Sequence, residues 1–363
     1  MSNFSFRKLI LFFIFIALFA GCSGKKTETG RFMVIVFSVG DARLVHSGQE
    51  IPARPGMLVV EQDQLKTLDG SMDLQTKSGS AIRIHPFTTI TAGRFSEGEG
   101  ETRFDLDHGG LLYSLNRNAR RQDFIIASPT AIASVRGTAF SMEMDSGRGP
   151  VVRVIEGSVA LSPRIRALEK IPSAQIDSMP GLKELAAVQK LEKVIVENSE
   201  GTLDSDFGKK LLEADSVVST SPSSEAIPRI ARDLLDGNNV RSEKTDISAR
   251  ELAQRDTLVV VSPETIQRMI ENRNDSSAAE DLVREHRKAQ ESALNGILER
   301  ASRVDLRTIE DIRSHYHSLE TIVLKNKEQI VGAVIAVTSE ELIVHTSAGV
   351  RRIKRDDVES QDF

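Results

Sequence analysis

The stretch Ser71–His85, SMDLQTKSGSAIRIH, decides the fold of the central part of this chain. Apolar and polar residues alternate on both sides of Lys77-Ser78-Gly79, which has the composition of a tight turn. A period of two places every second side chain on one face of a strand. We therefore predict two consecutive strands with one apolar face. The residues expected on that face, together with one from the next apolar run, are Met72, Leu74, Ile82, Ile84 and Ile90.

Short apolar runs of the same kind occur throughout residues 31–162. They are separated by Gly, Pro or Asp-Gly, as at Asp69-Gly70, and no helical pattern lies between them. Close spacing without helices predicts an all-β sandwich or a short β-solenoid. The further runs are residues 32–40 (FMVIVFSVG), 57–61 (MLVVE), 88–93 (TTITAG), 124–128 (FIIAS) and 151–162 (VVRVIEGSVALS).

Residues 133–140 read ASVRGTAF and contain Val135-Arg136-Gly137-Thr138. This segment is similar to the hallmark VRGT segment of the FecR domain, and it is the most specific of several pieces of residues 37–162 that resemble this family in order. The resemblance implies an extracytoplasmic β domain, solenoid-like or sandwich-like. The other pieces are Gly40-Asp41-Ala42, Pro55-Gly56-Met57-Leu58, Leu68-Asp69-Gly70-Ser71, residues 78–84, residues 124–129 and residues 152–159.

Two interpretations of the hallmark segment differ in what Arg136 does. In the functional one, its charge binds a ligand or a partner. In the structural one, Gly137 supplies a backbone conformation closed to other residues, and Arg136 pairs with a nearby acid. We favour the structural interpretation, because a glycine within a motif usually serves backbone geometry.

The N-terminus predicts export. Arg7 and Lys8 precede an uninterrupted apolar run, residues 9–20 (LILFFIFIALFA), which is followed by Gly21-Cys22. A short basic segment, an apolar run and a small-residue boundary form a secretory signal. The alternatives are a transmembrane anchor or a buried helix, but the run is shorter than the roughly 20 residues that a span needs.

Leu18-Phe19-Ala20-Gly21-Cys22 resembles a bacterial lipobox, of the relaxed form found in spirochaetes. The resemblance implies a signal peptide over residues 1–21, acylation of Cys22 and a lipidated tether over residues 22–30. Acyl chains would bind the lipid bilayer. We expect a cell-envelope protein anchored in the outer membrane, on its periplasmic or surface face, with the inner membrane as the alternative. Cys22 is the only cysteine, so no disulfide within the chain is expected.

Residues 163–318 are predicted to be a charged helical region with linkers. Residues 182–197 read as an amphipathic helix, Ser262-Pro263-Glu264 as a helix start, and Ser277 with Glu280 as a capping box. A seam of mainly apolar residues, spaced three and four positions apart along one helix face, predicts close packing between helices. Its members are Leu282, His286, Ala289, Ala293, Ile297 and Ala301.

Residues 319–363 are predicted to return to β structure, with turns at residues 325–328 and 347–349. This part resembles the small SH3-like or Sm-like module seen after FecR domains in spirochaete lipoproteins. The whole chain is thus expected to be mainly β with an α-helical middle.

Candidate chemistry is sparse. His315-Tyr316-His317 with Asp311 could suggest a metal or catalytic site, but residues two apart on a helix point to different sides. His286 reads as a packing residue. The motifs of nucleotide-binding loops and of serine hydrolases do not occur. We expect no enzyme activity, metal or cofactor, and with a net charge of −5 and no strongly basic domain we expect no nucleic-acid partner.

The basic cluster Arg351, Arg352, Lys354 and Arg355 could touch anionic lipid, but we favour a solvated edge strand protected by charge. Our leading hypothesis is a non-enzymatic module that binds a protein or an envelope polymer. The alternative is a signal-sensing relative of FecR-type regulators of sigma factors. Only eight residues precede the apolar run, so we expect no cytoplasmic anti-sigma segment.

Overall fold

The computed structural model describes residues 32–95, 100–114, 122–135, 137–145, 149–237, 240–272, 276–338 and 340–362. The predicted signal peptide, Cys22 and the tether lie outside these ranges, and so does Arg136 of the hallmark segment. No helix in the described ranges has the length and apolarity needed to cross a membrane.

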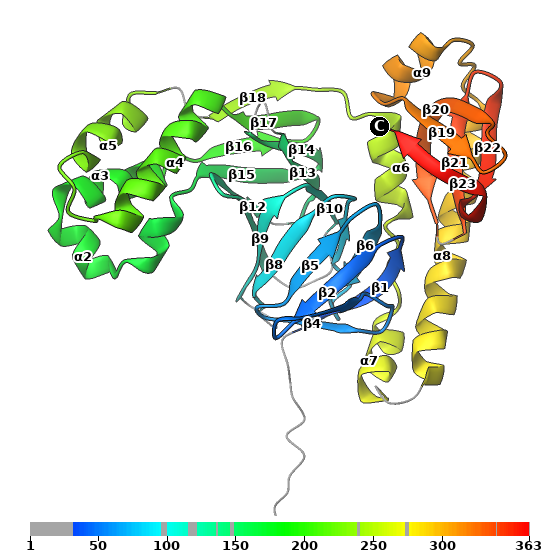
Figure 1. Ribbon diagram of the computed structural model, residues 1–363, viewed down its shortest axis with the longest axis horizontal. Coiled ribbons are helices and arrows are strands. Elements are labelled where there is room, and N and C mark those ends of the chain that lie inside the picture. The colour runs from blue at the N-terminus through cyan, green and yellow to red at the C-terminus, as the bar shows by residue number, and fades with distance from the viewer. Residues whose placement is uncertain are drawn as a thin grey trace, which may run out of the picture. The chain divides into compact units, whose positions relative to one another are not determined.

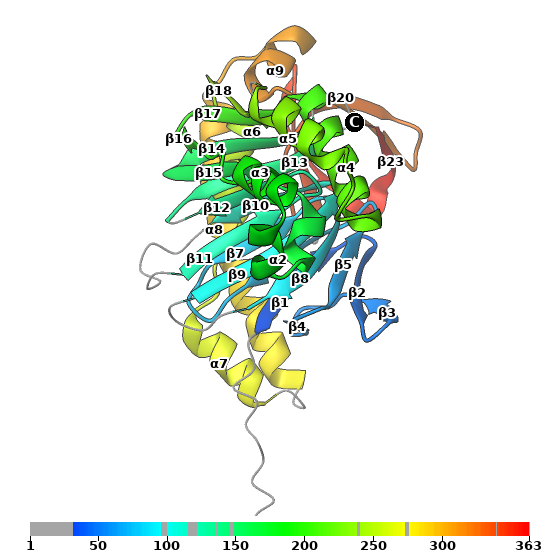
Figure 2. The same cartoon turned by 90° about the vertical axis from the view of Figure 1, so that its left-hand side faces the viewer.

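Two nine-stranded sheets dominate the fold (Figures 1 and 2). Sheet A has the order β18-β17-β14-β13-β10-β7-β6-β1-β4, and sheet B has the order β16-β15-β12-β11-β9-β8-β5-β2-β3. The first strands are β1 (Phe32–Val39), β2 (Ala42–His46), β3 (Gln49–Pro52), β4 (Leu58–Val60), β5 (Gln64–Thr67), β6 (Ser71–Gln75), β7 (Ala81–Ile84), β8 (Thr89–Arg94) and β9 (Gly100–His108). The others are β10 (Gly110–Ser114), β11 (Gln122–Ala127), β12 (Ala131–Val135), β13 (Ala139–Asp145), β14 (Gly149–Glu156), β15 (Ser158–Pro163), β16 (Lys193–Val196), β17 (Ser199–Leu203) and β18 (Val240–Lys244).

The chain alternates between the sheets in single strands or consecutive pairs, so that both layers are extended together. The two strands predicted over residues 71–85 are confirmed as β6 and β7, and they pair antiparallel with Met72 opposite Ile84 and Leu74 opposite Ile82. Ile90 lies on β8 of sheet B, and it reaches the same hydrophobic core from the facing layer. One core therefore lies between the two sheets, and the outer face of each sheet is left for other contacts.

The middle of the chain is not purely helical. The helix predicted over residues 182–197 is wrong in its second half, because α3 ends at Val188 and residues 193–196 form β16. Val194 and Ile195 are β-branched, which favours a strand, and Ile195 is buried in the core. The helices that precede α6 here are η1 (Arg166–Lys170), α2 (Ser173–Ser178), α3 (Pro180–Val188), α4 (Ser205–Thr220) and α5 (Ile227–Leu235).

Three helices cover the outer face of sheet A: α6 (Ala249–Thr257), α7 (Pro263–Glu271) and α8 (Ser276–Ser302). The helix start at Ser262 is confirmed, since its hydroxyl accepts a hydrogen bond from the amide of Thr265. The seam of α8 differs slightly from the prediction: Gln290 and Leu294 are buried where Ala289 and Ala293 are only half-buried.

The C-terminal part forms a separate five-stranded antiparallel sheet, sheet C, with the order β22-β21-β20-β19-β23. The predicted turns fall between its strands. One of its faces packs on α6, α8 and α9 (Ile309–Tyr316). The remaining elements are β19 (Glu320–Leu324), β20 (Gln329–Val337), β21 (Glu341–Thr346), β22 (Gly349–Lys354), η2 (Arg355–Asp357) and β23 (Val358–Asp362).

Candidate functional site

A cavity of about 760 Å³ lies between the outer face of sheet A, helix α6 and sheet C. Figure 1 shows α6 between the large sheets and the C-terminal strands. The walls of the cavity carry both positive and negative side chains, which come from segments far apart in the sequence. Representative lining residues are His85, Arg153, Glu251, His317 and Ser360.

A buried ion pair forms one end of this region. Asp73 on β6 lies directly opposite Arg83 on β7, and two hydrogen bonds of 2.8 and 2.6 Å join the guanidinium to the carboxylate. The other donors of Arg83 reach the carbonyls of Gln254 and Thr257 and the Thr257 hydroxyl, at 3.1, 2.9 and 2.7 Å. Asp73 is fully buried, so this bidentate pair ties sheet A to the end of α6.

Arg250 connects α6 to sheet C. Its guanidinium lies 2.7 Å from a carboxylate oxygen of Glu320, whose side chain is fully buried. The second carboxylate oxygen of Glu320 accepts a hydrogen bond from the amide of Val334 at 2.9 Å. The hydroxyl of Ser318 bonds to both Arg250 and Glu320. A buried carboxylate therefore sets the position of sheet C against the helix.

Arg153 on β14 lies among carboxylates on the cavity wall. Its side chain is 2.8 Å from Glu200 and 3.3 Å from Glu143, and Glu251 is 3.9 Å away. Burial acts to lower the pKa of Arg153, but the charges of Glu143, Glu251 and Glu200 raise it above the ordinary value. The guanidinium is therefore held firmly in its charged state.

Three buried polar atoms of the cavity residues make no hydrogen bond within the described residues: His85 Nε2, Arg250 Nε and Glu251 Oε1. Burial lowers the pKa of His85 to about 4, so its imidazole is neutral at pH 7. Buried polar atoms normally have partners. These atoms belong to residues that line the cavity, and together with the charges around Arg153 they make the cavity a candidate binding site.

The His315-Tyr316-His317 segment does not form a convergent catalytic cluster. Tyr316 is buried, and its hydroxyl lies 2.6 Å from Nδ1 of His345, a residue that the sequence did not single out. His317 ends α9 with a left-handed φ of 54°. Asp311 accepts a hydrogen bond from the amide of Thr308 as part of a capping box. Within the described ranges, no three His, Cys, Asp or Glu side chains are grouped to hold a metal.

The hallmark segment lies where the chain passes from β12 in sheet B to β13 in sheet A. Val135 is buried, and Gly137 has a φ of +67°, a region that glycine enters without steric cost. The Thr138 hydroxyl donates to the carbonyl of Ser158 at 3.2 Å. These contacts are those of a connection between layers, and the role of Arg136 stays a prediction.

Two other predictions concern histidine and the basic cluster. His286 is buried and stacks on Phe37 with ring centroids 5.3 Å apart, so the packing role is confirmed. β22 is an edge strand of sheet C, as predicted. Two of its arginines pair with acids, Arg351 with Glu328 and Arg352 with Glu341.

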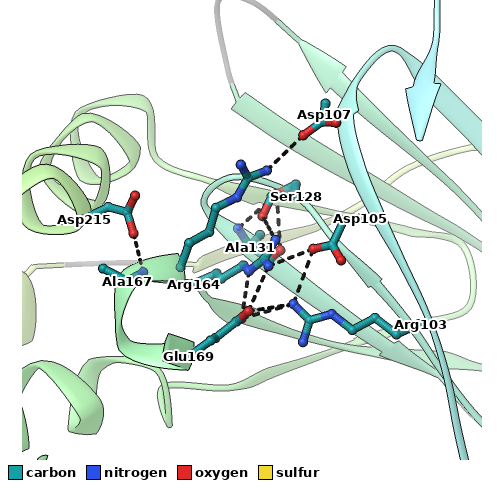
Figure 3. A network of polar contacts seen from close by, with 10 residues as sticks. Arg103, Asp105, Asp107, Ser128, Ala131, Arg164, Ala167, Glu169 and Asp215 are labelled. Atoms are coloured by element: carbon teal, nitrogen blue, oxygen red, sulfur yellow. Dashed lines mark hydrogen bonds and ion pairs between the residues drawn. The ribbon is translucent and has the colours of Figure 1, made fainter. Parts of the chain in front are cut away.

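A second polar network, which the sequence did not predict, lies on the outer face of sheet B (Figure 3). Arg164 is nearly buried and bonds Glu169 at 2.8 and 2.9 Å, Asp105 at 2.7 Å and the carbonyl of Ser128 at 2.8 Å. Arg103 also reaches Glu169, at 2.9 Å. Although burial acts to raise the pKa of Glu169, the hydrogen bond and charge of Arg164 hold it below the ordinary value. This network attaches η1 to sheet B.

Comparison with known proteins assigns part of the chain. Residues 63–160 match the family model described as "FecR protein". A FecR domain is therefore present over these residues. It spans β5 to β15 up to Ala160, within the region where the resemblance was expected.

No curated protein matches the sequence. Two solved structures of a proposed anti-sigma factor from Parabacteroides distasonis are similar at low level. The first is 11% identical with a TM-score of 0.32, covering 53% of this chain and 64% of that chain. The second is 13% identical with a TM-score of 0.25, covering 54% of this chain and 61% of that chain. The chain thus matches less than two thirds of either structure, and likenesses this weak carry no argument.

Proposed function

We propose that the protein is a lipid-anchored lipoprotein of the cell envelope whose FecR-containing part binds a protein or an envelope polymer without catalysing a reaction. The observation that carries the binding role is the charged cavity beside sheet A, where His85, Arg250 and Glu251 each have a buried polar atom that makes no hydrogen bond within the described residues. Buried polar groups without hydrogen bonds cost free energy, so a ligand that draws these side chains into the cavity would offset part of that cost. The anchor rests on the apolar run of residues 9–20 and on Cys22.

The proposal includes the finer architecture. We treat the FecR-containing part as a sandwich-like rather than a solenoid-like domain, because sheets A and B enclose one core. We treat sheet C as a variant of the SH3-like or Sm-like module. We place the anchor in the outer membrane, with no nucleic-acid partner and no cofactor.

Membrane fractionation of cells that express the full chain tests the anchor. We expect the wild-type chain in the membrane fraction and the Cys22→Ala chain largely in the soluble fraction, because the acyl chains would be missing. Protease treatment of intact and permeabilised cells then separates surface from periplasmic display. A Cys22→Ala chain that still partitions with membranes contradicts the lipoprotein assignment.

Co-sedimentation of the full chain with purified peptidoglycan sacculi tests the binding role with an envelope polymer as the probe. Glu251→Gln keeps the capping box of α6, in which the residue accepts from the amide of Ser248 at 3.0 Å, but removes the charge facing the cavity. We expect weaker binding for Glu251→Gln and unchanged binding for Lys210→Gln, on the exposed part of α4. Equal binding by all three proteins would exclude the cavity as the polymer site.

The second candidate function is signal sensing. The FecR domain at residues 63–160 favours it, because the resemblance to FecR-type regulators of sigma factors implies a sensing role. It predicts that deletion of the gene changes a defined set of transcripts in response to iron or another cue. A deletion strain with an unchanged transcriptome would argue for the binding or scaffold role alone.

A further inference from the structure

The C-terminal part of the chain has an open strand edge beside the cavity. β23 is the last strand of sheet C, and among the described residues it pairs with β19 alone. Its first three residues, Val358, Glu359 and Ser360, all line the cavity. Successive side chains of a strand point to opposite faces, so a cavity that meets three in a row runs along the edge of the strand. The backbone donors and acceptors on such an edge can pair with an added strand.

Arg355 begins η2, directly before this strand, and its side chain is partly buried and lines the cavity. Its guanidinium makes no ion pair or hydrogen bond within the described ranges. Burial lowers the pKa of Arg355 below the ordinary value, although the charges of Asp69 and Asp356 act to raise it. The other arginines of the cavity each have a carboxylate partner: Arg83 has Asp73, Arg153 has Glu200 and Arg250 has Glu320. A guanidinium suits a carboxylate, which it can bind with two parallel hydrogen bonds, so Arg355 is placed to receive one from a ligand.

Apolar side chains lie close to Arg355. Its amide donates to the carbonyl of Glu340 at 2.8 Å, which places it beside the turn between β20 and β21. Val337, at the end of β20, and Val358, at the start of β23, are partly buried on the core of sheet C and line the cavity. On the sheet A side, the ring of Phe87 is 57% exposed and also lines the cavity. The cavity therefore offers an apolar surface next to an unpaired positive charge.

We infer that the cavity binds the C-terminal segment of a partner protein, with its terminal carboxylate on Arg355 and its last residues added as a strand to β23. The chain of β23 runs away from Arg355, so the bound segment lies antiparallel to it. An apolar last side chain fits between Phe87 and the two valines. Strand addition and binding of a chain terminus are recurrent modes of peptide recognition. The inference rests on the binding role proposed for the cavity and commits that role to a protein partner.

A simpler account treats β23 as an edge that is merely protected. Lys327 lies 2.6 Å from Glu359, and charged side chains are a common means of keeping edges free of other strands. That account predicts no binding of peptides at β23, and it assigns no role to the unpaired Arg355. The two accounts therefore differ in a measurable outcome.

Retention of peptides by the immobilised full chain in detergent tests the carboxylate. The probe is a pool of short synthetic peptides, random in sequence except for a last residue of valine, leucine or phenylalanine, with a free terminal carboxylate. The control pool is identical but amidated at that end. We expect the wild-type chain to retain the free pool about tenfold better than the amidated one, because the charged hydrogen bonds to Arg355 are lost on amidation. Arg355→Gln should abolish the preference, and Arg352→Gln, which removes an exposed charge outside the cavity lining, should keep it.

Hydrogen exchange locates the added strand. With a retained peptide bound, the amides of β23 should exchange more slowly, whereas those of β22, at the other edge of sheet C, should be unchanged. Protection of β22 without protection of β23 overturns the strand pairing. In the absence of peptide, Arg355→Gln should exchange like the wild-type chain outside η2, which shows that the variant is folded.

The remaining outcomes separate this inference from the proposed function. Equal retention of the free and amidated pools overturns the inference, and so does a preference that Arg355→Gln leaves unchanged. If sacculi bind and Glu251→Gln weakens that binding while peptides are not retained, the cavity binds a polymer and only the protein partner is rejected. If neither sacculi nor peptides bind, the binding role of the cavity is rejected as well.

Discussion

Arg83 and Arg164 do comparable work on opposite outer faces of the double-layered domain. Arg83 holds α6 against sheet A, and Arg164 holds η1 against sheet B. Both guanidinium groups are nearly buried, but their carboxylate partners differ: Asp73 is fully buried, whereas Asp105 and Glu169 are 27% and 31% exposed. The difference indicates that the contribution of a buried arginine to stability depends on whether its partner carboxylate could reach water if the arginine were removed.

The largest effect is expected for Arg83→Met. The substitution strands the Asp73 carboxylate away from water and should lower the free energy of unfolding by about 3–5 kcal/mol. Urea denaturation of the full chain, followed by circular dichroism, measures it. In Arg83→Met/Asp73→Leu the stranded charge is gone, so much of the loss should be recovered. A single substitution that costs less than about 1 kcal/mol would show that Asp73 is not dependent on Arg83.

A smaller loss is expected for Arg164→Met. The carboxylates of Asp105 and Glu169 are partly exposed and keep access to water, and Arg103 still lies 2.9 Å from Glu169. Loss of the charged hydrogen bonds should therefore cost about 1.5–3 kcal/mol in the same denaturation experiment. The pKa of Glu169, which Arg164 holds down, should rise and can be followed by NMR titration. A loss as large as that of Arg83→Met would remove the distinction between the two faces.

The two faces should also differ in their response to acid. Burial lowers the pKa of His85 to about 4 and lowers that of His286, and both lie on the sheet A side. The unfolded chain binds protons at these residues below about pH 6.5, before the folded chain does. The contribution of these histidines to the free energy of unfolding is therefore fully present above pH 6.5. It is lost as the pH is lowered towards 4, by at most about 1.4 kcal/mol per pH unit for each histidine. His85→Gln should flatten this dependence in denaturation experiments across that range, and an unchanged slope would exclude His85 as a source.

The sequence predicted the strands better than the contacts that join them. Alternation located β6 and β7 because one face of each is apolar, and the turns of sheet C follow from short polar segments between apolar runs. The helix predicted over residues 182–197 failed at β16, since a run with spaced apolar residues fits either period until burial of Ile195 in the core decides.

The candidate site was largely invisible to the sequence. Asp73 and Arg83 could have been suspected as opposite charges at matching positions of one hairpin. The contacts of Gln254 and Thr257 with Arg83 could not have been predicted, because 171 and 174 residues separate these partners in the sequence. The cavity likewise combines residues from β7, β14, α6 and sheet C, and no local pattern encodes that assembly.

The smallest effect is expected for Arg352→Ala, on the edge strand β22. Arg352 bonds Glu341 at 2.8 Å, a distance as short as those in the buried networks, but its side chain is 53% exposed. Water hydrates Glu341 once the guanidinium is removed, so we expect the free energy of unfolding, measured by urea denaturation, to fall by about 0–1 kcal/mol. Added salt should reduce even this loss, because exposed pairs are screened. If Arg352→Ala cost as much as Arg164→Met, short distance rather than burial would set the strength of these pairs. The contrast between the two faces of the domain would then need another cause.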